Sequence, residues 1–194
     1  GAGKESFEKF RLDVYPERIH PKLGISPRAL MKRVYESAVS YTKTFSEGSD
    51  SLLFMGATGL GKTFLSGCIA RAVADKGYSV CYVSAGKLFS DFETEKFRLK
   101  EDGALTGEYL QTDLLIIDDL GTEMTTQFTV SALYQIVNGR LLSGKPTIVS
   151  TNLPDTELEA RYSAQIASRL LGAYTLYQFC GTDVRLLRKM ESRG

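Results

Sequence analysis

The chain contains little that would support a metal centre or catalysis by histidine. Its 194 residues include no Trp, one His and three Cys. His20 stands alone, which excludes chemistry by a histidine pair and favours a surface or capping role. The three cysteines are odd in number, widely spaced and set in apolar segments, so buried thiols are expected rather than a disulfide framework or a zinc site. They are Cys68, Cys81 and Cys180.

Long apolar runs and strong net charge are also missing. No apolar stretch approaches 18 residues and the first residues do not form a signal peptide, so we expect a cytoplasmic protein without a membrane span. The net charge is only +1, so any contact with nucleic acid requires a local basic patch. Residues 1–3, Gly-Ala-Gly, are expected to be a tag remnant. Residues 4–194 are expected to form one α/β domain.

What is present is an alternation of strand-like and helix-like runs, which is typical of a parallel sheet with helices on both faces. An irregular aromatic lead-in occupies 7–15. Ser26 and Pro27 are suited to the cap and first turn of a helix, and Gly77 to the left-handed position after one. We predict strands at 51–55, 80–84, 113–118, 146–151 and 174–179, and helices at 26–45, 62–76, 85–100, 126–142 and 157–170.

A glycine-rich segment between the first strand and the second helix fits the phosphate-binding pattern G-x-x-x-x-G-K-[ST]. Its glycines permit positive φ, so backbone N–H groups can turn towards a phosphate chain, and the helix N-terminus adds partial positive charge. Lys62 is expected to reach the β and γ phosphates, and Thr63 to ligate Mg²⁺. Nucleotide contacts are expected from Gly56, Ala57, Thr58, Gly59, Leu60, Gly61, Lys62, Thr63 and Phe64.

The strand at 113–118 ends in two carboxylates, the pattern of a Walker B element. Ligands of parallel sheets lie at the carboxyl ends of the strands. Asp118 is expected to hold Mg²⁺ through a water, and Asp119 to polarise the attacking water. Asp119 stands where many such ATPases have Glu, and its shorter side chain predicts slow or conditional hydrolysis of ATP to ADP and phosphate.

Together these motifs resemble the AAA+ ATPases of the DnaC/DnaI helicase loaders and the IstB transposition helpers. The resemblance covers nearly the whole chain and implies a three-layer αβα sandwich around a five-stranded parallel sheet, with a lid that is reduced or absent. It also implies that an N-terminal partner-binding domain precedes this ATPase domain in the full-length protein. Beyond the phosphate-binding loop, the matching segments are 116–123, 150–152, 168–170 and 181–185, with 7–10 and 24–27 in the lead-in.

The resemblance assigns roles to three further residues. Asn152 matches sensor 1, which orients the lytic water; its alternative is a turn residue, for which Asn is well suited. Arg169 matches the arginine finger, which acts on the nucleotide of a neighbouring subunit and so implies self-association. Arg185 matches sensor 2. Either arginine could instead be a solvated surface residue. Gln165 stands where the family often has Arg, which puts a second basic contact from this helix in doubt.

DNA contact is also implied by the resemblance. Basic and aromatic residues interleave between 87 and 100, as a surface for single strands requires, although several acids lie among them. Two of the aromatics are at helical spacing and could equally belong to the core. The candidate residues are Lys87, Phe89, Phe92, Lys96 and Arg98.

Two functions follow from the resemblance. The first is an ATP-dependent helicase loader that binds single-stranded DNA and a replicative ring helicase. The alternative is a transposition helper that coats duplex DNA and directs a transposase. A small-molecule kinase is less favoured, because no acceptor-binding insertion is evident.

Overall fold

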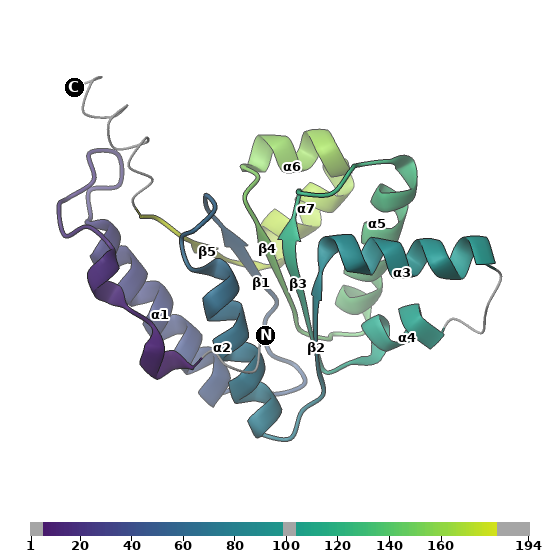
Figure 1. Cartoon of the computed structure of the whole chain (residues 1–194), viewed down its shortest axis with the longest axis horizontal. Helices are drawn as coiled ribbons and strands as arrows, with labels where there is room; N and C mark the ends of the chain where they lie inside the picture. The colour runs from purple at the N-terminus through teal and green to yellow at the C-terminus, as the bar shows by residue number, and fades with distance from the viewer. Residues whose placement is uncertain (1–5, 99–103, 182–194) are drawn as a thin grey trace.

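A five-stranded parallel sheet forms the centre of the computed structural model, which describes residues 6–98 and 104–181 (Figure 1). The order across the sheet is β2-β3-β4-β1-β5, so the first strand lies between the fourth and the fifth. Every neighbouring pair is parallel. The strands are β1 (Leu52–Met55), β2 (Val80–Ser84), β3 (Leu114–Leu120), β4 (Thr147–Thr151) and β5 (Thr175–Gln178).

Helices cover both faces of the sheet, as the alternating sequence pattern predicts (Figure 1). Successive residues of a strand point to opposite faces, so Leu52 and Phe54 pack beneath one layer while Leu53 and Met55 pack beneath the other. The first layer is α1 (Pro27–Lys43) and α2 (Lys62–Asp75). The second comprises α3 (Ala85–Arg98), α4 (Ala104–Gln111), α5 (Gln127–Leu142), α6 (Asp155–Tyr162) and α7 (Ala164–Ala173).

The local capping signals are confirmed. The Ser26 side chain accepts a hydrogen bond from the Ala29 N–H, and Pro27 occupies the first turn of α1. Gly77 follows α2 with φ 96°, the left-handed conformation that glycine adopts without strain. Helix ends therefore lie within about two residues of their predicted positions wherever a cap is encoded locally.

One predicted helix is wrong. The stretch at 157–170 is divided into α6 and α7 by Ser163, whose φ of 119° is incompatible with a continuous helix. The Ser163 side chain accepts from the Ile166 N–H and so caps α7. The short helix α4 was not predicted, and the lead-in contains the 3₁₀ turns η1 (Phe7–Lys9) and η2 (Leu12–Val14).

The predictions for the three cysteines and for His20 also need correction. The thiols are free, but only Cys68 is buried, whereas Cys81 and Cys180 are half-buried. His20 is 9% exposed, so it is not a surface residue, and its Nδ1 accepts the Lys22 N–H in the turn before α1. Within the described residues, no helix combines the length and apolar character needed to cross a membrane.

Arg140 on α5 is fully buried and joins α4 to the beginnings of β3 and β4. Its guanidinium donates to the carbonyls of Tyr109, Thr112 and Pro146 at 2.8–2.9 Å and to the Thr147 hydroxyl at 2.7 Å. Burial lowers the pKa of Arg140 to about 10. One side chain thus satisfies several carbonyls that would otherwise be buried without a donor.

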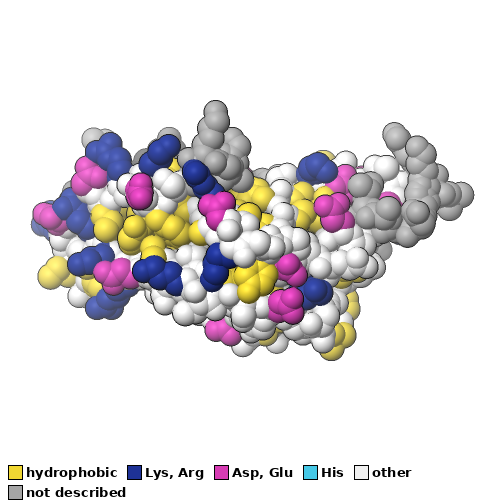
Figure 2. Space-filling model, turned by 90° about the horizontal axis from the view of Figure 1, so that it is seen from below, with side chains coloured by type: hydrophobic (Ala, Val, Ile, Leu, Met, Phe, Trp, Pro, Cys, Tyr) yellow, Lys and Arg dark blue, Asp and Glu magenta, His cyan; other side chains and the backbone are white. Residues whose placement is uncertain are grey.

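Figure 2 shows the underside of the molecule as drawn in Figure 1. Lys and Arg side chains are interspersed there with Asp and Glu around an apolar area. The described residues therefore offer no continuous basic patch on this face.

Candidate functional site

The phosphate-binding loop connects the end of β1 to the start of α2, at the carboxyl edge of the sheet (Figure 1). Gly56, Gly59 and Gly61 have φ of 147°, 80° and 97°. A Cβ at Gly56 would lie 2.7 Å from the Phe179 carbonyl oxygen, and a Cβ at Gly61 would lie 2.7 Å from the Tyr15 hydroxyl. The loop therefore needs glycine for both conformation and space, and its amides can surround an anion at the N-terminus of α2.

Lys62 begins α2 and folds back over the loop. Its ammonium is buried and donates to the carbonyl oxygens of Ala57, at 2.7 Å, and Gly56. Burial lowers the pKa of Lys62, and the carboxylates of Asp119 and Asp118 partly offset that effect. A phosphate entering the loop would offer this cation stronger acceptors than neutral carbonyls.

Thr63 and Asp118 are brought together as a pair of oxygen donors. The Thr63 hydroxyl donates to Asp118 Oδ2 at 3.0 Å, which joins the first turn of α2 to β3. Hydroxyl and carboxylate oxygens suit Mg²⁺, which keeps several waters and uses few protein ligands beside substrate phosphates. The donor set therefore fits the predicted magnesium site.

Two residues that sequence reasoning missed complete the surroundings of Asp118. The Tyr82 hydroxyl on β2 donates to Asp118 Oδ2 at 2.8 Å, and the Ser150 hydroxyl on β4 donates to Oδ1 at 2.5 Å. Asp118 is 7% exposed, so these donors replace water around its charge. A polar residue inside an apolar strand was the only local signal for Ser150.

Asp119 adopts a conformation that the sequence did not indicate. Its φ is 60°, where a side chain other than Gly is uncommon, and the pairing of β3 with β4 shifts register there. Its N–H donates to Ser150 Oγ at 3.1 Å. Asp118 is buried while the neighbouring Asp119 is exposed, so the two predicted carboxylates occupy different environments at one edge.

Asn152 lies directly after β4 and faces the phosphate-binding loop. Its Nδ2 donates to Thr58 Oγ1 at 2.8 Å. Lys62, Thr63, Asp118 and Asn152 therefore meet at the carboxyl edge of three adjacent strands.

Arg169 lies on α7, where it donates to the Gln165 carbonyl at 3.2 Å, and it also contacts α5. Its guanidinium contacts Asn138 Oδ1 at 3.1 Å and the Tyr134 hydroxyl at 3.3 Å, and stacks over the Tyr134 ring. The Arg169 side chain is half-buried. None of the hydrogen bonds described for it involves the phosphate-binding loop. The predicted sensor 2 residue, Arg185, lies outside the described residues.

The predicted DNA-binding residues are only partly available. Phe89 and Phe92 are 4% and 7% exposed and belong to the core, so their prediction as base-stacking residues is wrong. Their helical spacing points them at the sheet. Lys87 and Lys96 remain on the surface: Lys87 pairs with Asp91 at 2.8 Å, and Lys96 lies over the rings of two other phenylalanines. The side chain of Arg98 lies outside the described part of the chain.

The aromatic lead-in packs against the phosphate-binding loop. The Tyr15 hydroxyl donates to the Leu60 carbonyl at 2.6 Å, and burial raises the pKa of Tyr15 to about 12. Phe10 contacts Phe64. The ring of Phe64, which was predicted to contact nucleotide, therefore packs on the lead-in.

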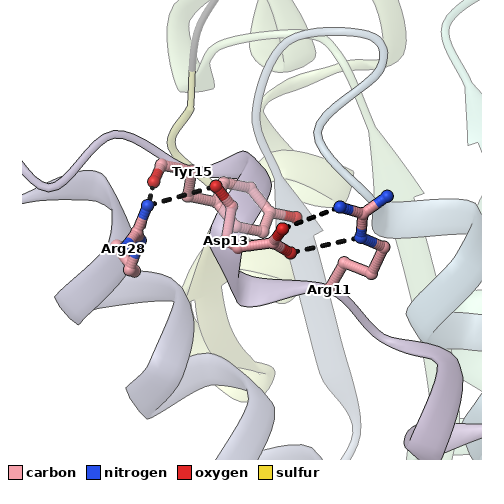
Figure 3. Close-up of polar contacts among 4 residues, drawn as sticks. All are labelled: Arg11, Asp13, Tyr15 and Arg28. Atoms are coloured by element: carbon pink, nitrogen blue, oxygen red, sulfur yellow. Dashed lines mark hydrogen bonds and ion pairs between the residues drawn. The ribbon is translucent and has the colours of Figure 1, made fainter.

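Arg28 fixes the lead-in to α1 (Figure 3). It donates to the carbonyls of Tyr15 at 2.9 Å and Asp13 at 3.1 Å. Arg11 pairs with the Asp13 carboxylate at 2.7 Å on the same segment. The lead-in therefore forms one wall of the site, which sequence reasoning had described only as irregular.

Comparison with known proteins identifies an ATP-binding family. The family described as IstB-like ATP binding protein matches residues 30–176, more than half of the chain. A relative from Mycobacterium tuberculosis, described as an ATP-binding protein in an insertion sequence, is 27% identical over 106 residues, 55% of this chain and 42% of the relative. The replicative helicase loader DnaC of Escherichia coli K12 is 26% identical over 135 residues, 69% of this chain and 55% of the relative. The chain thus spans about half the length of these curated relatives.

Solved structures share the fold. The DnaC helicase loader superimposes with a TM-score of 0.72 and 19% identity, covering 90% of this chain and 98% of that one. DnaI gives 0.74 with 17% identity, covering 92% and 93%. The initiator DnaA bound to AMPPCP and single-stranded DNA gives 0.72 with 21% identity, covering 98% and 55%. The fold is therefore that of an AAA+ P-loop domain, as the sequence resemblance implied.

Proposed function

The chain belongs to the IstB-like ATP-binding protein family, and from that premise we propose that it is the ATP-hydrolysing module of a replicative helicase loader. The observation that carries hydrolysis is the contact between Thr63 and Asp118, because it joins the phosphate-binding loop to the strand that bears the acids. ATP and Mg²⁺ are the proposed cofactors.

Binding of ATP would place its phosphates within the amides of the loop. Lys62 would exchange the carbonyls of Gly56 and Ala57 for phosphate oxygens, which are stronger acceptors for its charge. Thr63 and Asp118 would hold magnesium, the latter through a water, and the ion would supply positive charge beside the phosphates.

Hydrolysis would use residues on two further segments. Asp119 is exposed at the site and would orient the attacking water together with Asn152. The short Asp119 side chain supports slow turnover. Arg169 would leave Tyr134 and Asn138 to complete the site of a neighbouring subunit, so full activity requires self-association.

A ring helicase and single-stranded DNA are the proposed partners. The support is the 26% identity to DnaC and the coverage of about nine tenths of both chains in the comparisons with DnaC and DnaI. For DNA, the exposed Phe97 beside Phe128 and Lys96 offers a stacking face next to a cation, in place of the buried Phe89 and Phe92.

The family match and the insertion-sequence relative keep a transposition helper as the second candidate.

A capture assay distinguishes the helicase loader from the transposition helper. The full-length protein carrying this chain is tested against a replicative ring helicase with ATP, ADP and no nucleotide, and Lys62→Ala is the nucleotide control. Nucleotide-dependent capture supports the loader. Absence of capture together with filaments on duplex DNA supports the transposition helper.

A further inference from the structure

The turn after the Walker B acids contains a strained residue that its surroundings must hold. Asp119 has φ 60°, a conformation that persists in a residue other than Gly only when neighbouring contacts enforce it. Ser150 binds the Asp119 N–H before the turn, and the Thr122 hydroxyl donates to the Asp119 carbonyl at 3.0 Å after it. The orientation of the Asp119 carboxylate therefore depends on the turn at 121–125.

Glu123 folds back onto that turn. One carboxylate oxygen accepts the Gly121 N–H at 2.9 Å, and the other accepts the hydroxyl of Tyr162 on α6. Gly121 has φ 110°, and a Cβ there would lie 2.7 Å from Leu153, so the turn is also confined from the side of Asn152. A carboxylate can accept from both donors at once, one on each oxygen.

The end of α6 supports the same turn from outside. Arg161 donates to the Glu123 carbonyl at 2.5 Å and to the Thr125 hydroxyl at 2.9 Å. Tyr162 is fully buried, so its ring is fixed by the core and its hydroxyl is a rigid donor. The Glu123 carboxylate is therefore held by a backbone group within the turn and a core group outside it.

We propose that Glu123 is a positioning residue for ATP hydrolysis, because its contacts with Gly121 and Tyr162 fix the turn that holds Asp119 in place. This inference rests on the proposed hydrolysis. Glu123 makes no contact with nucleotide in this proposal. Its loss is therefore expected to lower the rate of turnover without weakening nucleotide binding.

The test compares Glu123→Ala, Tyr162→Phe and the double variant with the unaltered chain, in ATP turnover assays with single-stranded DNA. For Glu123→Ala we expect kcat to fall about tenfold or more, with KM and nucleotide Kd changed less than about twofold. Tyr162→Phe keeps the ring and loses one donor, so kcat should fall about threefold. The double variant should be no slower than Glu123→Ala, because the two side chains act through one contact.

Glu159→Ala is the matched control, since Glu159 is an exposed acid on α6, the helix that bears Tyr162, and its loss should leave kcat unchanged. An unchanged kcat for Glu123→Ala in a preparation where the unaltered chain is active would overturn this inference alone. So would a rise in KM that equals the fall in kcat. If Glu123→Ala does not fold, Tyr162→Phe decides by the same criteria. Absence of turnover in the unaltered chain would overturn the proposed hydrolysis, and this inference with it.

Discussion

The side-chain amide of Asn152 donates to the hydroxyl of Thr58 at 2.8 Å, which connects the end of β4 to the phosphate-binding loop. The two residues are 94 positions apart in sequence. In the proposed function, this amide would orient the water that attacks the γ phosphate. A catalytic role for Asn152 and a role confined to the turn that follows predict different effects of its replacement.

Replacing Asn152 tests that distinction. We expect Asn152→Ala and Asn152→Gly both to lower kcat about tenfold or more, with nucleotide Kd changed less than about threefold. Glycine is as acceptable as Asn in a turn, so it preserves turn geometry while removing the amide. Steady-state turnover and nucleotide titration provide the measurements. Normal turnover by Asn152→Gly would assign Asn152 to the turn.

Lys62→Ala should abolish tight nucleotide binding. The loss follows from removal of the cation that the loop holds beside its carbonyls, and we expect Kd to rise at least about 100-fold, or about 2.7 kcal/mol. Titration with a fluorescent ATP analogue measures it. Lys76→Ala is the control, because Lys76 lies beyond the opposite end of α2 and donates to the carbonyls of Thr42 and Lys43. Equal binding by both variants would contradict the assigned site.

Mixing two inactive variants tests whether Arg169 acts between subunits. Arg169→Ala retains its nucleotide site but offers no finger, whereas Lys62→Ala retains the finger but binds no nucleotide. Each alone should lose DNA-stimulated turnover, by a factor of about 10³ or more for the arginine. A mixture should regain part of the activity, because the second variant supplies Arg169 to the first. No recovery, or normal turnover by Arg169→Ala, would argue against a finger.

Single-stranded DNA binding should depend on Phe97 and Lys96. Phe97 is 67% exposed, and Lys96 lies 4.9 Å from the centre of the Phe128 ring. We expect Phe97→Ala to weaken binding by about 1–3 kcal/mol, the typical value of one stacked base. Fluorescence anisotropy with a labelled oligonucleotide measures this. Leu142→Ala removes an apolar residue of α5 that is even more exposed, at 81%, and should not affect affinity. Equal affinities for all proteins would exclude this surface.

Arg140→Met should destabilise the fold without acting at the site. The substitution leaves the buried carbonyls of Tyr109 and Thr112 without a donor, at about 1–3 kcal/mol for each unsatisfied group. We expect the free energy of unfolding, measured in urea, to fall by at least about 2 kcal/mol. Arg71→Met on the exposed face of α2 should change it by less than about 0.5 kcal/mol. A small effect at Arg140 would mean that water replaces its hydrogen bonds.

The sequence predicted most elements because their signals are local. Glycines at fixed spacing, capping Ser26, and apolar runs between turn residues each report on a few neighbouring residues, and the five strands and the phosphate-binding loop followed from them. The break at Ser163 had only a weak local signal, a serine that can cap a helix. The positive φ of Ser163 is maintained by the packing of the residues around it. Local sequence propensity does not report on that packing.

The sequence by itself determined the chemistry that this chain can offer, namely a phosphate-binding loop, a pair of acids and a polar residue after the next strand. Only the tertiary structure decided which side chains contribute to that chemistry. Parallel pairing brought Ser150 and Tyr82 to Asp118 and directed Phe89 and Phe92 into the core. These outcomes depend on the order of strands and on which helix face meets the sheet. Both are set by burial of apolar surface across the whole domain, which no short segment of sequence records.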